Sequence, residues 1–117
     1  MRHQVRKAKL GTDKDHTTAL LRNLAMSVII NEKVQTTERR ARYAQPFVER
    51  LITIGKTKET RESIRLITSL LQHESSCRKI LEVLKDRYKD KESGFTRITK
   101  IKNRKGDNAQ IVQIELT

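Results

Sequence analysis

The chain's 117 residues suit one domain with a modest core rather than two domains. Its 26 Lys and Arg outnumber 14 Asp and Glu to give a formal net charge of +12, which favours a polyanionic partner such as nucleic acid. One cysteine excludes an internal disulfide, and the lack of a long apolar run excludes a secretory signal and a membrane partner, so we expect a cytoplasmic protein.

Residues 1–12 are predicted to form a basic N-terminal arm. Four cations and no acid occur between Arg2 and Lys9, and Gly11 interrupts regular structure. Such a segment cannot bury enough apolar surface to fold by itself, so we expect it to become ordered only on a polyanion. Residues 13–117 are predicted to form a single domain.

A first amphipathic helix is predicted to begin near His16. Asp13 and Asp15 stand just before the apolar pattern, where a carboxylate can accept the free backbone N–H groups of a first turn. Six apolar residues then recur at three- and four-residue intervals and share one face: Leu20, Leu21, Leu24, Ala25, Val28 and Ile29. This face is expected to pack in the core.

A second amphipathic helix is predicted to start near Glu38, after an extended link over residues 31–37. Val34 and its neighbours could add a strand, and Thr36 or Thr37 is expected to cap the helix. One face of this second helix is apolar and another face is cationic. The apolar stripe contains Ala44, Phe47, Val48, Leu51 and Ile52, and the cations are Arg39, Arg40, Arg42 and Arg50.

Two further helices are predicted between Glu59 and Glu92, separated by residues 72–76. Their net charge is only +1, against +8 for residues 1–58 and +3 for residues 93–117, so the cationic surface is expected at the two ends of the chain. The middle helices are expected to cover the core, with a protein neighbour as a further option. Their apolar positions are Ile64, Ile67, Leu70 and Leu71, then Cys77, Ile80, Leu81, Leu84 and Tyr88.

The last segment changes to a period of two. Residues 95–101 alternate imperfectly, residues 102–110 are rich in turn formers, and Val112, Ile114 and Leu116 lie on one side of a second strand. This pattern predicts a β-hairpin with a bulge in its first strand. The predicted fold class is therefore α+β, a single small domain of about four helices packed with a small sheet that includes the C-terminal β-hairpin.

No catalytic constellation is found in the sequence. His3, His16 and His73 have neither the spacing nor the cysteine partners of a metal site, and the four glycines are isolated rather than grouped in a phosphate-binding loop. We therefore expect no enzyme activity, no metal, no cofactor and no small-molecule substrate.

Folded RNA is favoured over DNA as the partner. A DNA-binding protein could use the basic second helix as a recognition helix, but the link before it is longer and more extended than a helix-turn-helix connection. The cations also occupy both ends of the chain. With 3% aromatic residues, recognition is expected to rest on phosphate, ribose and shape rather than on base stacking.

Two long motifs resemble the bacterial large-subunit ribosomal protein family L17. The run RNLAMSVIINEKVQTT followed by ARYAQPFVERLITIGK is similar to the centre of that family, in which a proline often stands at the position of Pro46. The runs DRYKDKESGFTRI and RKGDNAQIVQIEL are similar to its closing pattern, and MRH to its opening. Together these motifs extend the resemblance over nearly the whole chain. The middle helices match the family only in their apolar pattern.

The resemblance implies a structural constituent of the cytoplasmic large ribosomal subunit. It implies binding to large-subunit ribosomal RNA and contact with neighbouring ribosomal proteins, without a cofactor or catalysis, and we expect no homo-oligomer on the ribosome. Candidate RNA-binding residues lie in the arm, at the helix starts and on the hairpin. They are Arg2, His3, Arg6, Lys7, Lys9, Lys14, His16, Arg22, Asn23, Lys33, Arg39, Arg40, Arg42, Arg97, Lys100, Lys102, Arg104, Lys105 and Asn108.

Overall fold

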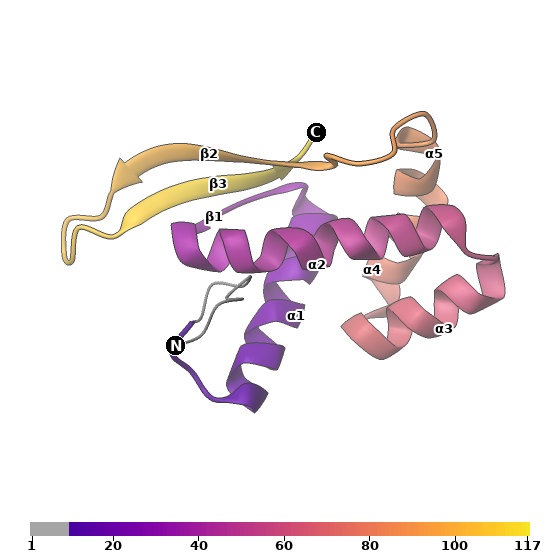
Figure 1. Cartoon of the computed structure of the whole chain (residues 1–117), viewed down its shortest axis with the longest axis horizontal. Coiled ribbons are helices and arrows are strands. Elements are labelled where there is room, and N and C mark those ends of the chain that lie inside the picture. The colour runs from indigo at the N-terminus through magenta and orange to yellow at the C-terminus, as the bar shows by residue number, and fades with distance from the viewer. Residues whose placement is uncertain (1–9) are drawn as a thin grey trace, which may run out of the picture.

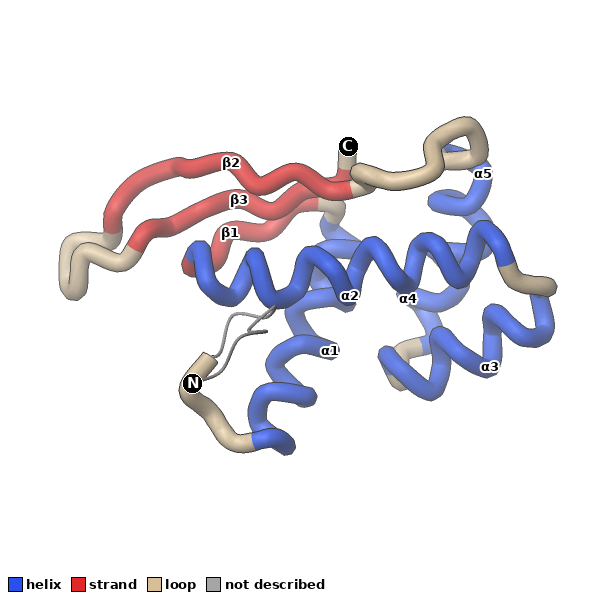
Figure 2. Tube along the Cα trace, viewed as in Figure 1, coloured by secondary structure: helices blue, strands red, loops and turns tan. Residues whose placement is uncertain are grey.

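The computed structural model describes residues 10–117, which form four helical segments and one three-stranded sheet (Figures 1 and 2). The fourth segment runs without a break through α4, a π-helical turn η1 and α5. The predicted α+β class is confirmed. The elements are α1 (Lys14–Asn31), β1 (Lys33–Thr37), α2 (Glu38–Thr57), α3 (Thr60–Leu71), α4 (Glu74–Lys79), η1 (Ile80–Leu84), α5 (Lys85–Arg87), β2 (Thr96–Asn103) and β3 (Gln110–Leu116).

Helix α2 is the central element of the domain. The sheet lies along its first half, while α3 and η1 pack against its second half and α1 crosses it (Figure 1). Its buried positions repeat at helical spacing, so one stripe contacts all of these neighbours. They are Ala41, Ala44, Val48, Leu51, Ile52, Ile54 and Gly55.

The sheet is antiparallel, with strand order β1-β3-β2. Val34 of β1 and Ile98 of β2 both pair with Ile114 of β3, and this row of apolar side chains faces the helices. The register shifts between Lys100 and Lys102, where β2 carries one extra residue. The predicted third strand, hairpin and bulge are therefore confirmed.

The predicted N-terminal cap is found at α1 but not at α2. Asp13 caps α1, because its Oδ1 accepts the backbone N–H of His16 at 2.8 Å. Thr37 occupies the N-cap position of α2, but its side chain makes no capping hydrogen bond, so the predicted threonine cap is wrong. Pro46 lies on the exposed side of α2, which continues through it to Thr57.

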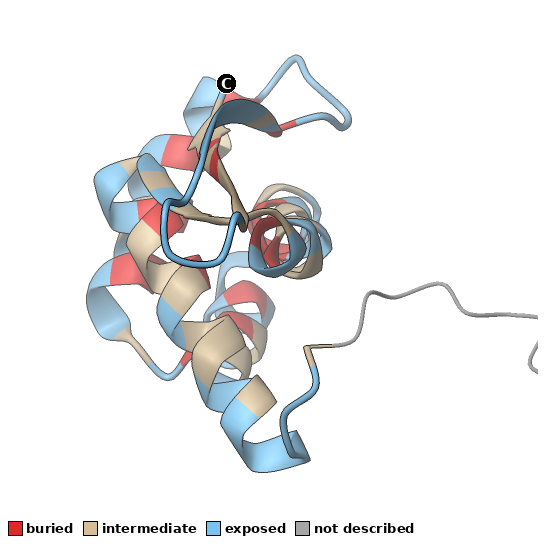
Figure 3. Cartoon of the chain, turned by 90° about the vertical axis from the view of Figure 1, so that its left-hand side faces the viewer, coloured by how far each residue is buried: buried red, intermediate tan, exposed pale blue. Residues whose placement is uncertain are grey.

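Some residues at the N-terminal ends of the predicted apolar stripes of α1 and α3 are less buried than expected. Ala25, Val28 and Ile29 are buried, but Leu20, Leu21 and Leu24 are only partly covered, because the first turns of α1 extend beyond the other helices (Figure 3). Ile64 of α3 is 44% exposed, since that helix packs by a face that contains Ser63, Ile67 and Leu71. The loop between α3 and α4 is also shorter than predicted, at Gln72 and His73.

Close packing joins α2 to its helical neighbours. The buried Ser63 hydroxyl donates to the carbonyl oxygens of Ile54, at 3.1 Å, and Lys58, at 3.2 Å. Gly55 faces η1 so closely that a Cβ atom there would lie 2.6 Å from Ile80 Cγ2. The absence of a side chain at Gly55 therefore allows the π-helical turn to lie against α2.

Replacing Gly55 by Ala should test this contact. A helix interior normally gains stability from this change, but here the added methyl group clashes with Ile80. We expect a loss of about 1–3 kcal/mol in the free energy of unfolding, measured with urea, as in other overpacked cores. Gly106→Ala is the control, since a Cβ atom at that position would have no neighbouring atom within 4 Å. Equal stability of the two variants would contradict the assignment.

Glu32 holds the corner between α1 and β1. It ends α1 with a left-handed backbone, φ 67°, and its carbonyl oxygen accepts Leu116 N–H at 2.9 Å. Glu32 Oε1 lies 2.8 Å from Arg87 Nη2 and 3.0 Å from Lys79 Nζ. These two cations, Arg87 first, lower the pKa of Glu32 from 4.5 to about 2. Ion pairs from the fourth helical segment thus fix the start of β1.

Replacing Glu32 by Gln should remove a pH-dependent contribution to stability. A lowered carboxyl pKa stabilises the folded state above the unfolded pKa, and this contribution is lost as the pH falls through 4.5 towards 2. Because the ion pairs are partly exposed, we expect the free energy of unfolding of the variant to be about 1 kcal/mol lower than that of the wild type near neutral pH. This difference in the free energy of unfolding should shrink in acid.

Chemical denaturation across the pH range measures this difference. Glu92→Gln is the control, since Glu92 is exposed and has no ion-pair partner within residues 10–117. A deficit in Glu32→Gln that stayed constant down to pH 2 would show that the ion pairs are not its source.

Candidate nucleic-acid interface

The start of α2 and the C-terminal hairpin meet at one end of the domain (Figure 1). A cleft of about 430 Å³ between them is lined by residues 37–39 and Arg42 on one side and by Ala109 and Gln110 on the other. The exposed cations on both sides of this cleft form what we term the cationic end. Its members are Arg39, Arg40, Arg42, Lys100, Lys102, Arg104 and Lys105.

Several predicted cations have no carboxylate partner within residues 10–117. Around the cationic end these are Arg40, Lys100, Lys102 and Lys105, and Lys14 and Lys33 share this property. Their side chains are exposed, so a phosphate would not have to displace a protein carboxylate to bind them. These residues are the strongest candidates for direct contact with a polyanion.

Other predicted cations are engaged in exposed ion pairs. Arg42 Nε lies 3.0 Å from Glu38 Oε1 within the first turns of α2, and Arg97 Nη1 lies 4.0 Å from Glu115 Oε1 across the hairpin. Such pairs contribute little to stability in water. A phosphate could therefore exchange with the carboxylate at little cost, but these arginines offer less free charge than their unpaired neighbours.

The hairpin turn is held by Arg104 and Asp107. Two hydrogen bonds join them, from Nε to Oδ1 at 3.0 Å and from Nη2 to Oδ2 at 2.7 Å, and Ala109 N–H donates to Oδ1 at 3.1 Å. The Arg104 guanidinium, followed by this N–H, lowers the pKa of Asp107 to about 2. Asn108 provides the left-handed residue, φ 57°. Arg104 and Asn108 therefore shape the turn that presents Lys105.

Arg22 has a structural contact that its sequence position did not indicate. Its Nε donates to the carbonyl oxygen of Leu70 at 2.9 Å, across 48 residues, and the side chain is partly buried between α1 and α3. The next residue, Asn23, is exposed. The RNA-binding roles assigned to both residues stay predictions, and Arg22 also joins two helices.

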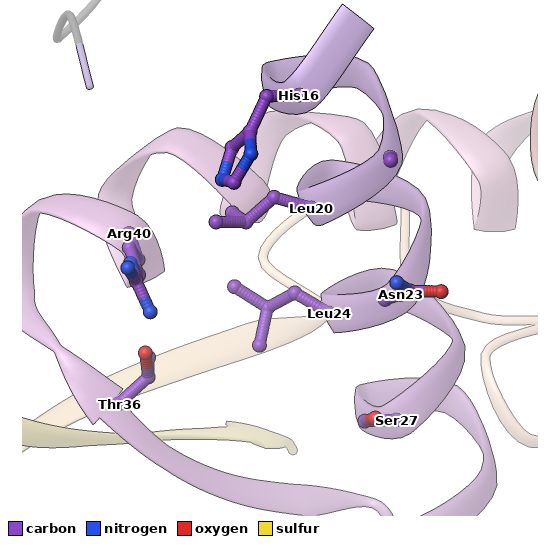
Figure 4. A pocket seen from close by; sticks show the side chains of 8 residues that line it. His16, Leu20, Asn23, Leu24, Ser27, Thr36 and Arg40 are labelled. Carbon is purple, nitrogen blue, oxygen red and sulfur yellow. The ribbon is translucent and has the colours of Figure 1, made fainter. Parts of the chain in front are cut away.

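A groove of about 390 Å³ lies between α1 and the start of α2 (Figure 4). His16, Leu20 and Leu24 reach from α1 towards Thr36 and Arg40, which close the opposite side. Ala19, Asn23 and Ser27 complete its lining. Two predicted site residues from different elements, His16 and Arg40, therefore share one surface. Sequence periodicity missed this groove because it assigned both leucines to the core.

The predicted arm residues Arg2, His3, Arg6, Lys7 and Lys9 lie outside the described residues. Within residues 10–117, no group of three His, Cys, Asp or Glu side chains could hold a metal ion. No helix in the same range is both long and apolar enough to cross a bilayer.

The geometry gives no support to a helix-turn-helix. The link between α1 and α2 is strand β1, paired with β3 along its whole length. Helix α2 also packs one face against the sheet, α1, α3 and η1, so it is a central helix of the domain rather than a protruding one. The exposed cations at the start of α2 lie at the same end of the domain as those of the hairpin.

Comparison with known proteins gives the family. The sequence profile described as ribosomal protein L17 matches residues 20–117. A large ribosomal subunit protein bL17 of Wolbachia sp. subsp. Drosophila simulans (strain wRi) is 40% identical over 117 residues, which is 99% of this chain and 82% of the relative. The protein of the same name from Exiguobacterium sp. (strain ATCC BAA-1283 / AT1b) is 40% identical over 93% of this chain and 97% of its own.

A third relative, also named large ribosomal subunit protein bL17, comes from Ehrlichia canis (strain Jake). It is 39% identical over 119 aligned residues, which cover 99% of this chain and 90% of the relative. These matches confirm the resemblance seen in the central and closing motifs. The chain belongs to the ribosomal protein L17 family.

Proposed function

We propose that this chain binds large-subunit ribosomal RNA through the cationic end of the domain and through its basic arm. As a member of its family it is a structural constituent of the large subunit in the cytoplasmic ribosome. The observation that carries the RNA-binding proposal is that exposed cations without a carboxylate partner within residues 10–117 gather at one end of the domain. They are Arg40 of α2 and Lys100, Lys102 and Lys105 of the hairpin.

The proposed mechanism is counter-charge held in a fixed geometry. Helix α2 and the hairpin are positioned by the core, so their cations keep a defined spacing, and phosphates that fit this spacing release condensed counterions on binding. RNA segments that repel one another can then approach during subunit assembly. The family is structural rather than enzymatic, and this mechanism requires neither a cofactor nor a catalytic group.

The two predicted parts of the chain have different roles in this proposal. Residues 13–117 form the domain that fixes the spacing of cations, and residues 1–12 contribute a basic arm that follows an RNA groove. The arm adds phosphate contacts without adding to the core.

The end of the domain formed by α3 and η1 is proposed to face neighbouring ribosomal proteins. Ile64 and Val83 are 44% and 42% exposed there, and residues 59–92 have a net charge of only +1. Such a surface gains little from phosphate and more from apolar contact. One copy per subunit, without homo-oligomerisation, is part of this proposal.

Sedimentation of a cell lysate tests the proposal directly. The chain should travel with large ribosomal subunits, be nearly absent from small subunits, and remain at about one copy per particle after a moderate salt wash that leaves phosphate contacts in place. Recovery of the chain mainly with chromosomal DNA would contradict the proposal and favour the DNA-binding alternative.

Removing two cations from the hairpin should weaken RNA binding in a salt-dependent way. For Lys100→Gln with Lys102→Gln we expect lower affinity and a salt slope smaller by about 2, since two phosphate contacts are lost. The measurement is a filter-binding titration with large-subunit RNA at several salt concentrations.

Arg61→Gln with Arg65→Gln is the matched control for the hairpin variant. It makes the same change of net charge on α3, away from the cationic end. All four side chains are exposed, so neither variant should lower the melting temperature. Equal loss of affinity in the two variants would show that net charge, rather than the cationic end, determines binding.

A further inference from the structure

The groove beside α1 leaves apolar surface uncovered at a place where the sequence predicts core. Leu20 and Leu24 lie on its floor and are only partly buried, in a groove of about 390 Å³ (Figure 4). This volume is near the lower end of the range of about 300–1,000 Å³ found for small-molecule pockets. Burial of these leucines by a ligand would remove further apolar surface from water.

Planar and polar groups surround that apolar floor. The imidazole of His16 and the guanidinium of Arg40 stand at opposite walls, and the Thr36 hydroxyl lies beside Arg40 (Figure 4). Neither the ring of His16 nor the guanidinium of Arg40 has a hydrogen-bond or ion-pair partner within residues 10–117. Both groups stack on nucleobases in RNA-binding proteins, and Arg40 can also bind a phosphate.

We propose that this groove receives one unpaired nucleotide of the ribosomal RNA. The base lies on Leu20 and Leu24 between His16 and Arg40, and Arg40 is placed to pair with the adjoining phosphate. This inference rests on the proposed RNA-binding function and adds to it a site for a single base. It also modifies the expectation from composition, because His16 and Arg40 provide stacking surfaces that a count of Phe, Trp and Tyr omits.

Charge and position favour a nucleotide over other occupants. Arg40 belongs both to the groove and to the cationic end, so the groove continues the surface on which the phosphate backbone is proposed to lie. Within residues 10–117 the lining contains no acidic side chain that would repel a phosphate. An apolar side chain of a protein neighbour would use the floor but leave Arg40 without an anion.

Blocking the groove without changing charge tests this proposal. Ala19 is exposed and lines the groove, so Ala19→Phe places a ring in its mouth with little effect on the core. Thr18→Phe is the control, because Thr18 is exposed on the same helix but is not part of the lining. Both full-length variants are titrated with a transcript of the complete large-subunit RNA.

We expect Ala19→Phe to bind at least tenfold more weakly than Thr18→Phe, with the same melting temperature and a salt slope smaller by no more than about 1, since at most the Arg40 contact to the adjoining phosphate is lost. In chemical probing of base edges, one unpaired nucleotide should be protected by the wild type and by Thr18→Phe but exposed with Ala19→Phe. Equal affinity of the two variants would overturn the inference and leave the proposed function intact.

Two other outcomes separate the remaining explanations. If a chain that lacks residues 2–9 binds RNA equally well with and without Ala19→Phe, the groove holds the chain's own arm and the inference is wrong. If the wild type itself binds RNA weakly and independently of salt, the proposed function fails, and the inference that rests on it fails too.

Discussion

The packing of one stripe of α2 is the constraint on which the domain depends. This helix has 20 residues, so it is about 30 Å long, and no single neighbour can cover it. Its first half buries the small residues Ala41 and Ala44, which allow the sheet to approach closely. Its second half buries Leu51, Ile52 and Gly55 against α3 and η1. A long helix whose stripe has small residues in its first half and larger ones in its second half thus packs against both the sheet and the other helices.

The charge distribution follows from this arrangement. Residues 1–58 contribute +8 and residues 93–117 contribute +3, and the sheet brings parts of both segments to the start of α2. Residues 59–92, which add only +1, cover the other half of that helix. Segments that are distant in sequence therefore form one cationic end, where protein carboxylates pair with Arg42 and Arg104 but not with Arg40, Lys100, Lys102 or Lys105 within residues 10–117. On the proposed function, a polyanion relieves the remaining self-repulsion.

Periodicity predicted most of the fold because it reflects which face of an element is apolar. It placed the stripe of α2, the buried end of α1 and the alternation of β3, and the imperfect alternation of β2 marked the bulge. It could not show how far a neighbour extends, so Leu24 and Ile64 are more exposed than expected. The π-helical turn was also missed; its Ile80 packs against Gly55, 25 positions away, and such a tertiary contact leaves no sign in the local period.

The candidate site could be predicted from sequence only as a set of residue types. Charge identified Arg40 and Lys102, but the same criterion selected Arg22, whose guanidinium bonds to Leu70, and Arg104, which holds a turn. These partners come from tertiary contact or from turn geometry, so net charge cannot distinguish a free cation from an engaged one. The groove lies beyond sequence patterns for the same reason, because α1 and α2 form it jointly.

A surface of cations alone would not define a unique position on a large RNA. Phosphates repeat along every strand and carry no sequence information, so fixed cations select the shape of the backbone but tolerate neighbouring registers. A groove that accepts one unpaired base next to Arg40 would remove this freedom, because an unpaired base that is free to leave the stack stands at a defined point of a folded RNA. On the proposed function, phosphate contacts supply most of the affinity and the groove supplies the register.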